Sequence, residues 1–181
     1  MQNILQNKTR SLHKHEKARE IIHIVGIKTQ EQLQYHISDI TTLALDAVFP
    51  DPYKLKVKFI QRRNKTECDL IFVRDDMEID PMEESGLGAV DVAAFTLRIA
   101  SWSMERPRTH NTIILDEPFK HLKGEVANKR VLDMINEISK RLGIQIIMIS
   151  DERIPREDII TAADRAFEVS IKNRISQIKV L

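Results

Sequence analysis

Apolar residues recur three and four positions apart between about residues 12 and 48, a spacing that predicts helix. No proline interrupts this stretch, and Phe-Pro-Asp-Pro at 49–52 ends it. We therefore predict a helical segment over 1–48, either one helix or two that break at Gly26. Its first twenty residues carry too few apolar positions to bury a face alone, so we expect an exposed helix or the end of a coiled coil.

After Pro52 the apolar residues recur at every second position. Apolar residues alternate with lysines from Tyr53 to Phe59, which predicts a half-buried strand. Residues 61–66 can form a turn and residues 67–73 a returning strand, so we predict an antiparallel hairpin. The acidic stretch 75–84 is interpreted as a linker.

Helices and short apolar strands alternate in the rest of the chain. The helix after residues 85–88 is predicted to bury Val90, Ala93, Ala94, Leu97, Ser101 and Met104. Residues 112–115 and 144–149 predict two buried strands on either side of a helix whose apolar face is Ala127, Val131, Met134, Ile135, Ile138 and Leu142. Because a crossover helix joins them, these strands are expected to be parallel. A short helix at 154–163 and strands at 166–171 and 176–181 complete the α/β pattern.

Composition narrows the class of protein. The 181 residues carry 28 Lys and Arg against 27 Asp and Glu, and 42% are hydrophobic, which suits one globular unit and argues against disorder. No apolar run is long enough for a membrane span, and the polar start does not resemble a signal peptide, so we expect a cytoplasmic protein with no membrane partner. The single cysteine, Cys68, excludes an intrachain disulfide.

Two carboxylates end the strand predicted at 112–115, in the order Asp116-Glu117-Pro118. Ligands bind outside the carboxyl ends of strands in open α/β sheets, and this is a Walker B pattern. Asp116 would hold the Mg²⁺ of a nucleoside triphosphate through water, and Glu117 would orient or deprotonate the attacking water. The alternative is a strand-end turn whose acids are merely solvated.

Ser85-Gly86-Leu87-Gly88 opens a helix. Glycines let backbone N–H groups approach an anion, and a serine hydroxyl adds a donor, so the segment suits a phosphate. The alternative is ordinary helix capping by Ser85.

The order of these motifs resembles the carboxy-terminal lobe of an ABC-type ATPase, in the branch of the structural-maintenance-of-chromosomes and double-strand-break-repair proteins. The resemblance implies an ATPase lobe over 49–181, with 1–48 as coiled-coil stump and lobe helix. It implies that Ser85, Gly86 and Gly88 cap the γ-phosphate of ATP on the opposite protomer. Residues 119–124 would be the D-loop region, and Asp151 would lie beside the γ-phosphate.

Three positions depart from the family pattern: Leu87 replaces a glycine, Lys123 an aspartate, and Asp151 a histidine. No P-loop motif occurs in the sequence, so we expect ATP and Mg²⁺ to bind only with an amino-terminal P-loop lobe. The resemblance also implies a head-to-head dimer with a second copy and a role in DNA repair, recombination or chromosome maintenance at the nucleoid. A nuclease subunit is a candidate partner.

The predicted hairpin is rich in cations that could contact DNA phosphates without reading bases: Lys54, Lys56, Lys58, Arg62, Arg63 and Lys65. The alternative is a solvated strand face that blocks edge-to-edge pairing. The acidic stretch 75–84 could partly neutralise the patch.

Two other functions fit parts of the sequence. A metal-dependent phosphodiesterase could use Asp116, Glu117, Asp151 and Glu152, which follow two strands predicted to be parallel. This hypothesis leaves the Ser-Gly segment unused. The other hypothesis is a structural lobe that dimerises without hydrolysing ATP.

Overall fold

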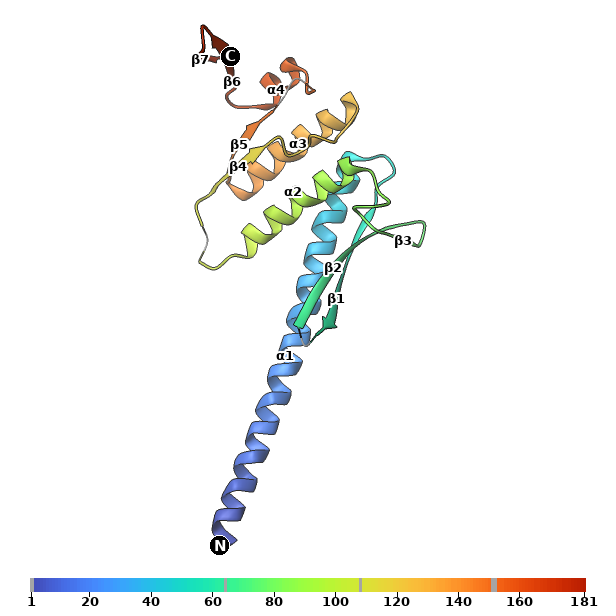
Figure 1. Cartoon of the computed structure of the whole chain (residues 1–181), viewed down its shortest axis with the longest axis vertical. Coiled ribbons are helices and arrows are strands. Elements are labelled where there is room, and N and C mark those ends of the chain that lie inside the picture. The colour runs from blue at the N-terminus through green and yellow to red at the C-terminus, as the bar shows by residue number, and fades with distance from the viewer. Residues whose placement is uncertain (1, 64, 108, 151–152) are drawn as a thin grey trace.

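A computed structural model of the chain describes residues 2–63, 65–107, 109–150 and 153–181. Its longest element is α1 (Gln2–Val48), whose first half projects alone from the rest of the protein (Figure 1). The helix is continuous, so the break considered at Gly26 does not occur; no atom lies within 4 Å of a Cβ placed there, and a helix tolerates one exposed glycine. Only its last turns are packed, with Leu45 and Val48 fully buried.

The predicted hairpin is confirmed and belongs to a three-stranded antiparallel sheet. Strands β1 (Lys54–Arg62) and β2 (Lys65–Arg74) pair as far as Arg62 opposite Lys65, so the turn is shorter than predicted. A third strand, β3 (Met77–Ile79), pairs with β2 inside the stretch interpreted as a linker. Asp75 and Asp76 make this turn with positive φ angles, a conformation that aspartate tolerates better than most residues.

Helix α1 covers both a face and an edge of this sheet. Leu55, Val57 and Phe72 belong to the core cluster that also contains the end of α1. The hydroxyls of Thr42 and Ser38 accept hydrogen bonds from the backbone N–H groups of Leu55 and Val57, at 3.0 and 3.3 Å. The helix therefore satisfies two N–H groups on the open edge of β1.

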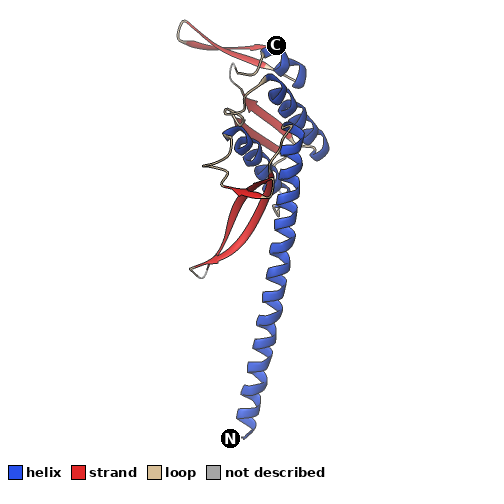
Figure 2. Cartoon of the chain, turned by 90° about the vertical axis from the view of Figure 1, so that its right-hand side faces the viewer, coloured by secondary structure: helices blue, strands red, loops and turns tan. Residues whose placement is uncertain are grey.

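The strand–helix–strand unit is also confirmed. Strands β4 (Thr112–Asp116) and β5 (Gln145–Ile149) pair in parallel, and α3 (Glu125–Leu142) connects them (Figure 2). Val131, Met134 and Ile135 are buried on α3 as predicted, whereas Leu142 is exposed. The two strands were predicted to be buried, but only one face is: Ile113 and Leu115 point into the core, and Ile114 on the other face is 68% exposed.

The predicted face of α2 (Leu87–Met104) is partly wrong. The helix buries Ala89, Val92, Ala93, Phe95, Thr96, Ile99, Ala100 and Trp102. Ala94 and Ser101 are exposed instead. The large apolar residues Phe95, Ile99 and Trp102 occupy the buried face. Thr96 lies among them because its hydroxyl donates to the Val92 carbonyl of the preceding turn at 2.9 Å.

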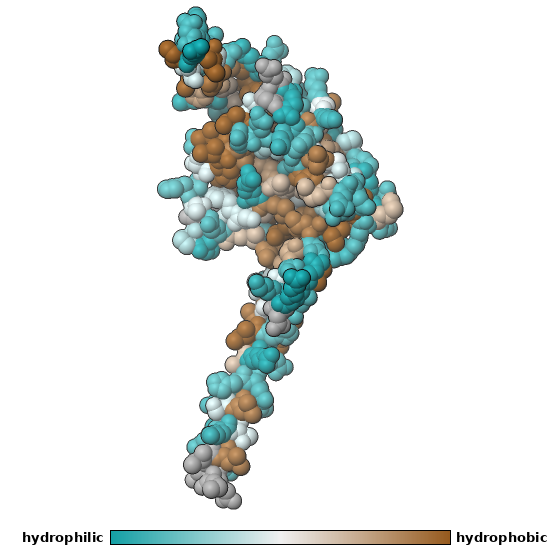
Figure 3. Space-filling view, viewed as in Figure 1, coloured by the Kyte–Doolittle hydropathy of each residue, from teal (hydrophilic) through white to brown (hydrophobic). Residues whose placement is uncertain are grey.

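The carboxy-terminal part comprises α4 (Arg156–Ala162) and a hairpin of β6 (Phe167–Lys172) and β7 (Ile175–Val180). This hairpin lies at the end of the protein opposite the amino terminus (Figure 1). One of its faces is apolar and exposed, through Phe167, Val169, Ile171, Ile178 and Val180. Brown surface at this end of Figure 3 marks the same region. Within the described part of the chain, no helix is long and apolar enough to cross a membrane.

Candidate functional site

Asp116 and Glu117 lie where β4 ends. Asp116 pairs with Ile149 on β5, and the backbone N–H of Glu117 donates to the Ile149 carbonyl at 3.0 Å. Glu117 has a φ of 42°, a left-handed conformation that is sparsely populated for residues other than glycine and turns the chain out of the strand. Strand alternation puts Asp116 on the exposed face with Ile114. Both carboxylates therefore lie at the carboxyl edge of the parallel pair.

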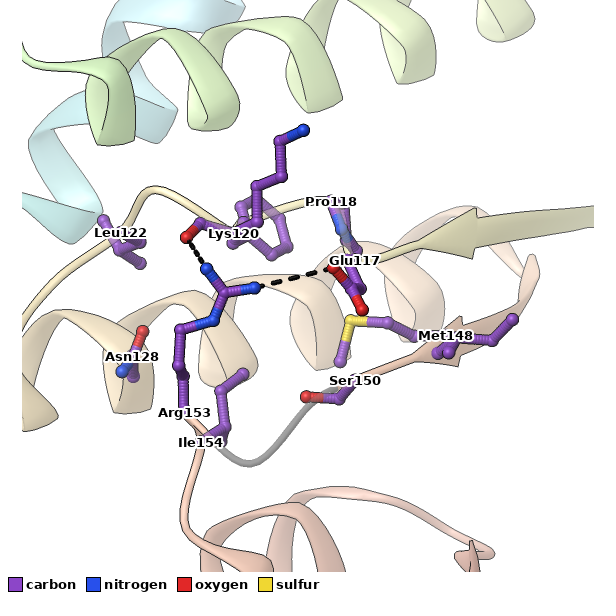
Figure 4. A pocket seen from close by; sticks show the side chains of 11 residues that line it. Glu117, Pro118, Lys120, Leu122, Asn128, Met148, Ser150, Arg153 and Ile154 are labelled. Atoms are coloured by element: carbon purple, nitrogen blue, oxygen red, sulfur yellow. Dashed lines mark hydrogen bonds and ion pairs between the residues drawn. The ribbon is translucent and has the colours of Figure 1, made fainter. Parts of the chain in front are cut away.

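A small pocket lies beside Glu117 (Figure 4). Its lining includes Ser150 from the end of β5, Asn128 from α3 and Arg153. A guanidinium nitrogen of Arg153 lies 3.5 Å from Oε2 of Glu117, and another nitrogen donates to the Lys120 carbonyl. Our sequence reasoning missed Arg153, because its partner Glu117 lies 36 positions earlier and meets it only through the pairing of β4 and β5.

Ser85 and Gly86 precede α2, and Gly86 is its N-cap residue. The Ser85 hydroxyl donates to the Pro81 carbonyl at 2.6 Å, and no side chain caps the helix. The capping role considered for Ser85 is therefore wrong. The segment 85–88 instead presents a helix start whose first amides are not occupied by a capping side chain.

Gly88 brings this helix start against the loop that follows Glu117. A Cβ at Gly88 would lie 3.2 Å from Cα of Leu122 and 3.3 Å from the His121 carbonyl oxygen, so only glycine fits without movement. Asp91, one turn further along α2, accepts the backbone N–H of His121 at 2.8 Å and lies 3.2 Å from its ring Nδ1. The segment 85–88 and the loop after Asp116-Glu117 are thus one packed unit.

The donor set suits Mg²⁺ held jointly with a phosphate. Asp116 is exposed at the strand end. Among the residues that the structure describes, no group of three or more His, Cys, Asp or Glu could hold a metal ion by itself. Mg²⁺ is typically bound through one or two carboxylates, waters and substrate phosphates, so one strand-end aspartate fits this role. Asp151 and Glu152 lie outside the described residues, so their predicted roles stay predictions.

Part of the basic patch is neutralised within its own sheet. Lys54, Lys56 and Lys58 share one face, as the register of β1 requires. Glu78 of β3 binds Nζ of Lys56 at 2.8 Å and of Lys58 at 2.6 Å, and these hydrogen bonds lower the pKa of Glu78 to about 2.

The turn of the hairpin also pairs its own charges. Arg62 contacts Asp69 at 2.8 Å and Glu67 at 3.2 Å, and hydrogen bonds to these carboxylates raise its pKa. Three of the six cations, Lys54, Arg63 and Lys65, have no ion-pair partner among the described residues. The cationic surface left for a ligand is therefore smaller than the sequence suggested.

Neither a protein-family model nor a curated protein sequence matches the chain. Solved structures do. The chain is similar to a structure from work on ATP-driven dimerization and DNA-stimulated activation of SMC ATPases, with 20% identity and a TM-score of 0.60 over 85% of this chain and 88% of that one.

Two larger SMC heads are also similar. One is the Smc head domain of Pyrococcus furiosus with an extended coiled coil bound to the C-terminal domain of ScpA (20% identity, TM-score 0.62), of which this chain covers 40%. Another is the Smc head domain of Pyrococcus yayanosii with a coiled coil and joint (19% identity, TM-score 0.64), of which it covers 33%. The α/β fold is thus that of a lobe of an ABC-type ATPase, and more narrowly that of part of an SMC head.

Proposed function

We propose that this chain is the signature and Walker B half of an ATP-hydrolysing SMC-type head, which acts in DNA repair, recombination or chromosome maintenance. The observation that carries the proposal is the packing of the segment 85–88 onto the loop that follows Asp116 and Glu117, through Gly88 and Asp91. An ATPase of this type needs a signature segment and a metal-binding strand end held in a fixed relation. The same proposal places the protein in the cytoplasm, at the nucleoid.

Each residue of the candidate site has a specific role in the proposed ATP hydrolysis. Asp116 would hold Mg²⁺, which when bound neutralises charge on the β- and γ-phosphates. Glu117 orients a water molecule toward the γ-phosphorus and takes its proton as the new P–O bond forms. The bond between the γ-phosphorus and the bridging oxygen breaks, and ADP leaves with that electron pair. The amides that begin α2 would face the phosphate of the nucleotide on a second copy. Ser85 would join them by giving up the hydrogen bond that its hydroxyl donates to the Pro81 carbonyl.

The outer face of β4 and β5 supports the need for a P-loop lobe. Ile114, Ile147 and Ile149 are 68, 46 and 54% exposed on this face, beside Asp116. A face of isoleucines at the edge that carries the metal ligand suits a second apolar layer. A P-loop lobe seated there would bring its phosphate-binding loop to Asp116.

DNA contact is a smaller part of the proposal. Lys54, Arg63 and Lys65 remain as cations that could bind phosphates without base recognition. The phosphodiesterase alternative is less favoured, because it gives no role to the segment 85–88, which is packed against the loop after Glu117. A nuclease subunit would then be a partner and not an activity of this chain.

The test combines the chain with the P-loop lobe of the same protein. We expect Mg²⁺-dependent ATP hydrolysis only in the mixture, and we expect Glu117→Gln to lower kcat by about 10²- to 10⁴-fold while ATP still drives dimerisation, because only proton acceptance is lost. Steady-state phosphate release and light scattering measure the two effects. The control, Glu31→Gln, changes an exposed carboxylate on α1. Unchanged hydrolysis in Glu117→Gln would refute the assignment, and inertness of the wild-type mixture would favour the structural lobe.

A further inference from the structure

Arg153 crosses the pocket that contains Glu117. Its guanidinium reaches the Glu117 carboxylate at 3.5 Å and the Lys120 carbonyl, so it joins the segment after β5 to the loop after β4 (Figure 4). Lys120 also lines the pocket, but its ammonium group points away from Glu117 in this view. Arg153 is therefore the cation placed to act on the carboxylate.

The contact between Arg153 and Glu117 is of an exchangeable kind. The two side chains are 50% and 44% exposed, and a single nitrogen approaches a single oxygen. Exposed pairs of this geometry contribute little to stability, so breaking the contact between Arg153 and Glu117 itself costs little. Arginine prefers phosphate and carboxylate groups that accept two parallel hydrogen bonds, and a terminal phosphate offers three oxygens and more charge than one carboxylate.

The pocket also lies where a phosphate would arrive. It adjoins the carboxyl ends of β4 and β5, the edge at which open α/β sheets bind ligands. Ser150 and the 94%-buried Asn128 line it together with Arg153, so polar groups from three segments converge there.

We propose that Arg153 is a phosphate-binding residue of this half-site, which restrains Glu117 before nucleotide binds and then moves to the terminal phosphate of a nucleoside triphosphate. The exchange frees the Glu117 carboxylate to accept a proton from water. It couples activation of the base to the presence of the phosphate that will be removed. This inference rests on the proposed function.

The experiment compares MgATP and MgADP, because ADP lacks the terminal phosphate. In the complex with the P-loop lobe, Arg153→Gln should weaken MgATP binding by about tenfold or more and leave MgADP binding unchanged. Arg153→Lys should restore part of the loss. The matched control is Arg156→Gln, three positions further on, which breaks an exposed pair with Glu168 at 3.1 Å and should behave as wild type. Calorimetric titration gives the dissociation constants, and circular dichroism checks the fold.

Equal weakening for MgATP and MgADP would overturn the proposal, since it would indicate a structural role. So would affinities in Arg153→Gln that match those of Arg156→Gln. A wild-type complex that binds no MgATP would instead refute the proposed function and this inference together. Selective loss of MgATP with unchanged MgADP supports both.

Discussion

The outer faces of the two main sheets of this protein carry different kinds of side chain. The antiparallel sheet β1–β3 buries one face against α1 and presents on the other the ion pairs of Lys56 and Lys58 with Glu78. The parallel pair β4–β5 also buries one face, but its outer face presents Ile114, Ile147 and Ile149. A face whose charges are paired within the sheet is typical of a solvent-exposed surface. A face of isoleucines beside a strand-end carboxylate is instead typical of an interaction site. The difference identifies the side of the protein on which a partner is expected.

The largest expected effect separates the buried face of the antiparallel sheet from the exposed face of the parallel pair. Phe72→Ala empties a fully buried site where the ring stacks on Tyr53, with centroids 5.0 Å apart, and should lower the free energy of unfolding by about 3–5 kcal/mol. Ile147→Ser changes a half-exposed position on the second sheet and should cost less than about 1 kcal/mol. Urea unfolding of the isolated chain measures both. A large loss in Ile147→Ser would mean that this face is already covered, and concentration dependence would identify self-association.

A smaller effect is expected where α2 meets the loop after β4. Gly88→Ala places a Cβ 3.2 Å from the backbone of Leu122 and should destabilise by about 1–2 kcal/mol. The control, Gly86→Ala, has no atom within 4 Å and an ordinary φ of −73°, so it should be neutral within about 0.5 kcal/mol. Thermal unfolding of the two variants gives the difference. Equal stability would show that the loop yields easily and would weaken the proposed coupling of the two motifs.

Local periodicity was enough to predict α1, the hairpin and the β4–α3–β5 unit, because in each the repeat of apolar residues follows the geometry of one element. Periodicity failed where packing between residues far apart in the sequence determines the structure. Thr96 is buried through a bond to its own helix, and β3 exists because β2 offers it an edge. The pairs Asp91–His121 and Arg153–Glu117 join residues 30 and 36 positions apart, a separation that no local pattern signals.

The smallest expected effect concerns the charged outer face of the sheet β1–β3. The pKa of Glu78 is lowered from its ordinary 4.5 to about 2 by hydrogen bonds from Lys56 and Lys58. Because the folded value is the lower one, these pairs stabilise the fold above about pH 4.5, and the contribution is lost as the pH falls through about 2. Glu78→Gln should therefore lower the melting temperature slightly at pH 6, and the gap to wild type should close toward pH 2.

Salt and a second variant make this last prediction sharper. The Glu78 carboxylate is exposed, so the difference in melting temperature at pH 6 should shrink as salt rises from low concentration to about 1 M, where charges are screened within roughly 3 Å. Glu83→Gln, at another exposed carboxylate, should not change the melting temperature at any pH. A gap for Glu78→Gln that is constant between pH 6 and pH 2 would mean that its amide alters packing and not charge. The ion pairs on the β1–β3 face would then not stabilise the fold. The difference between this face and the isoleucine face of β4–β5 would lie in side-chain packing and not in charge.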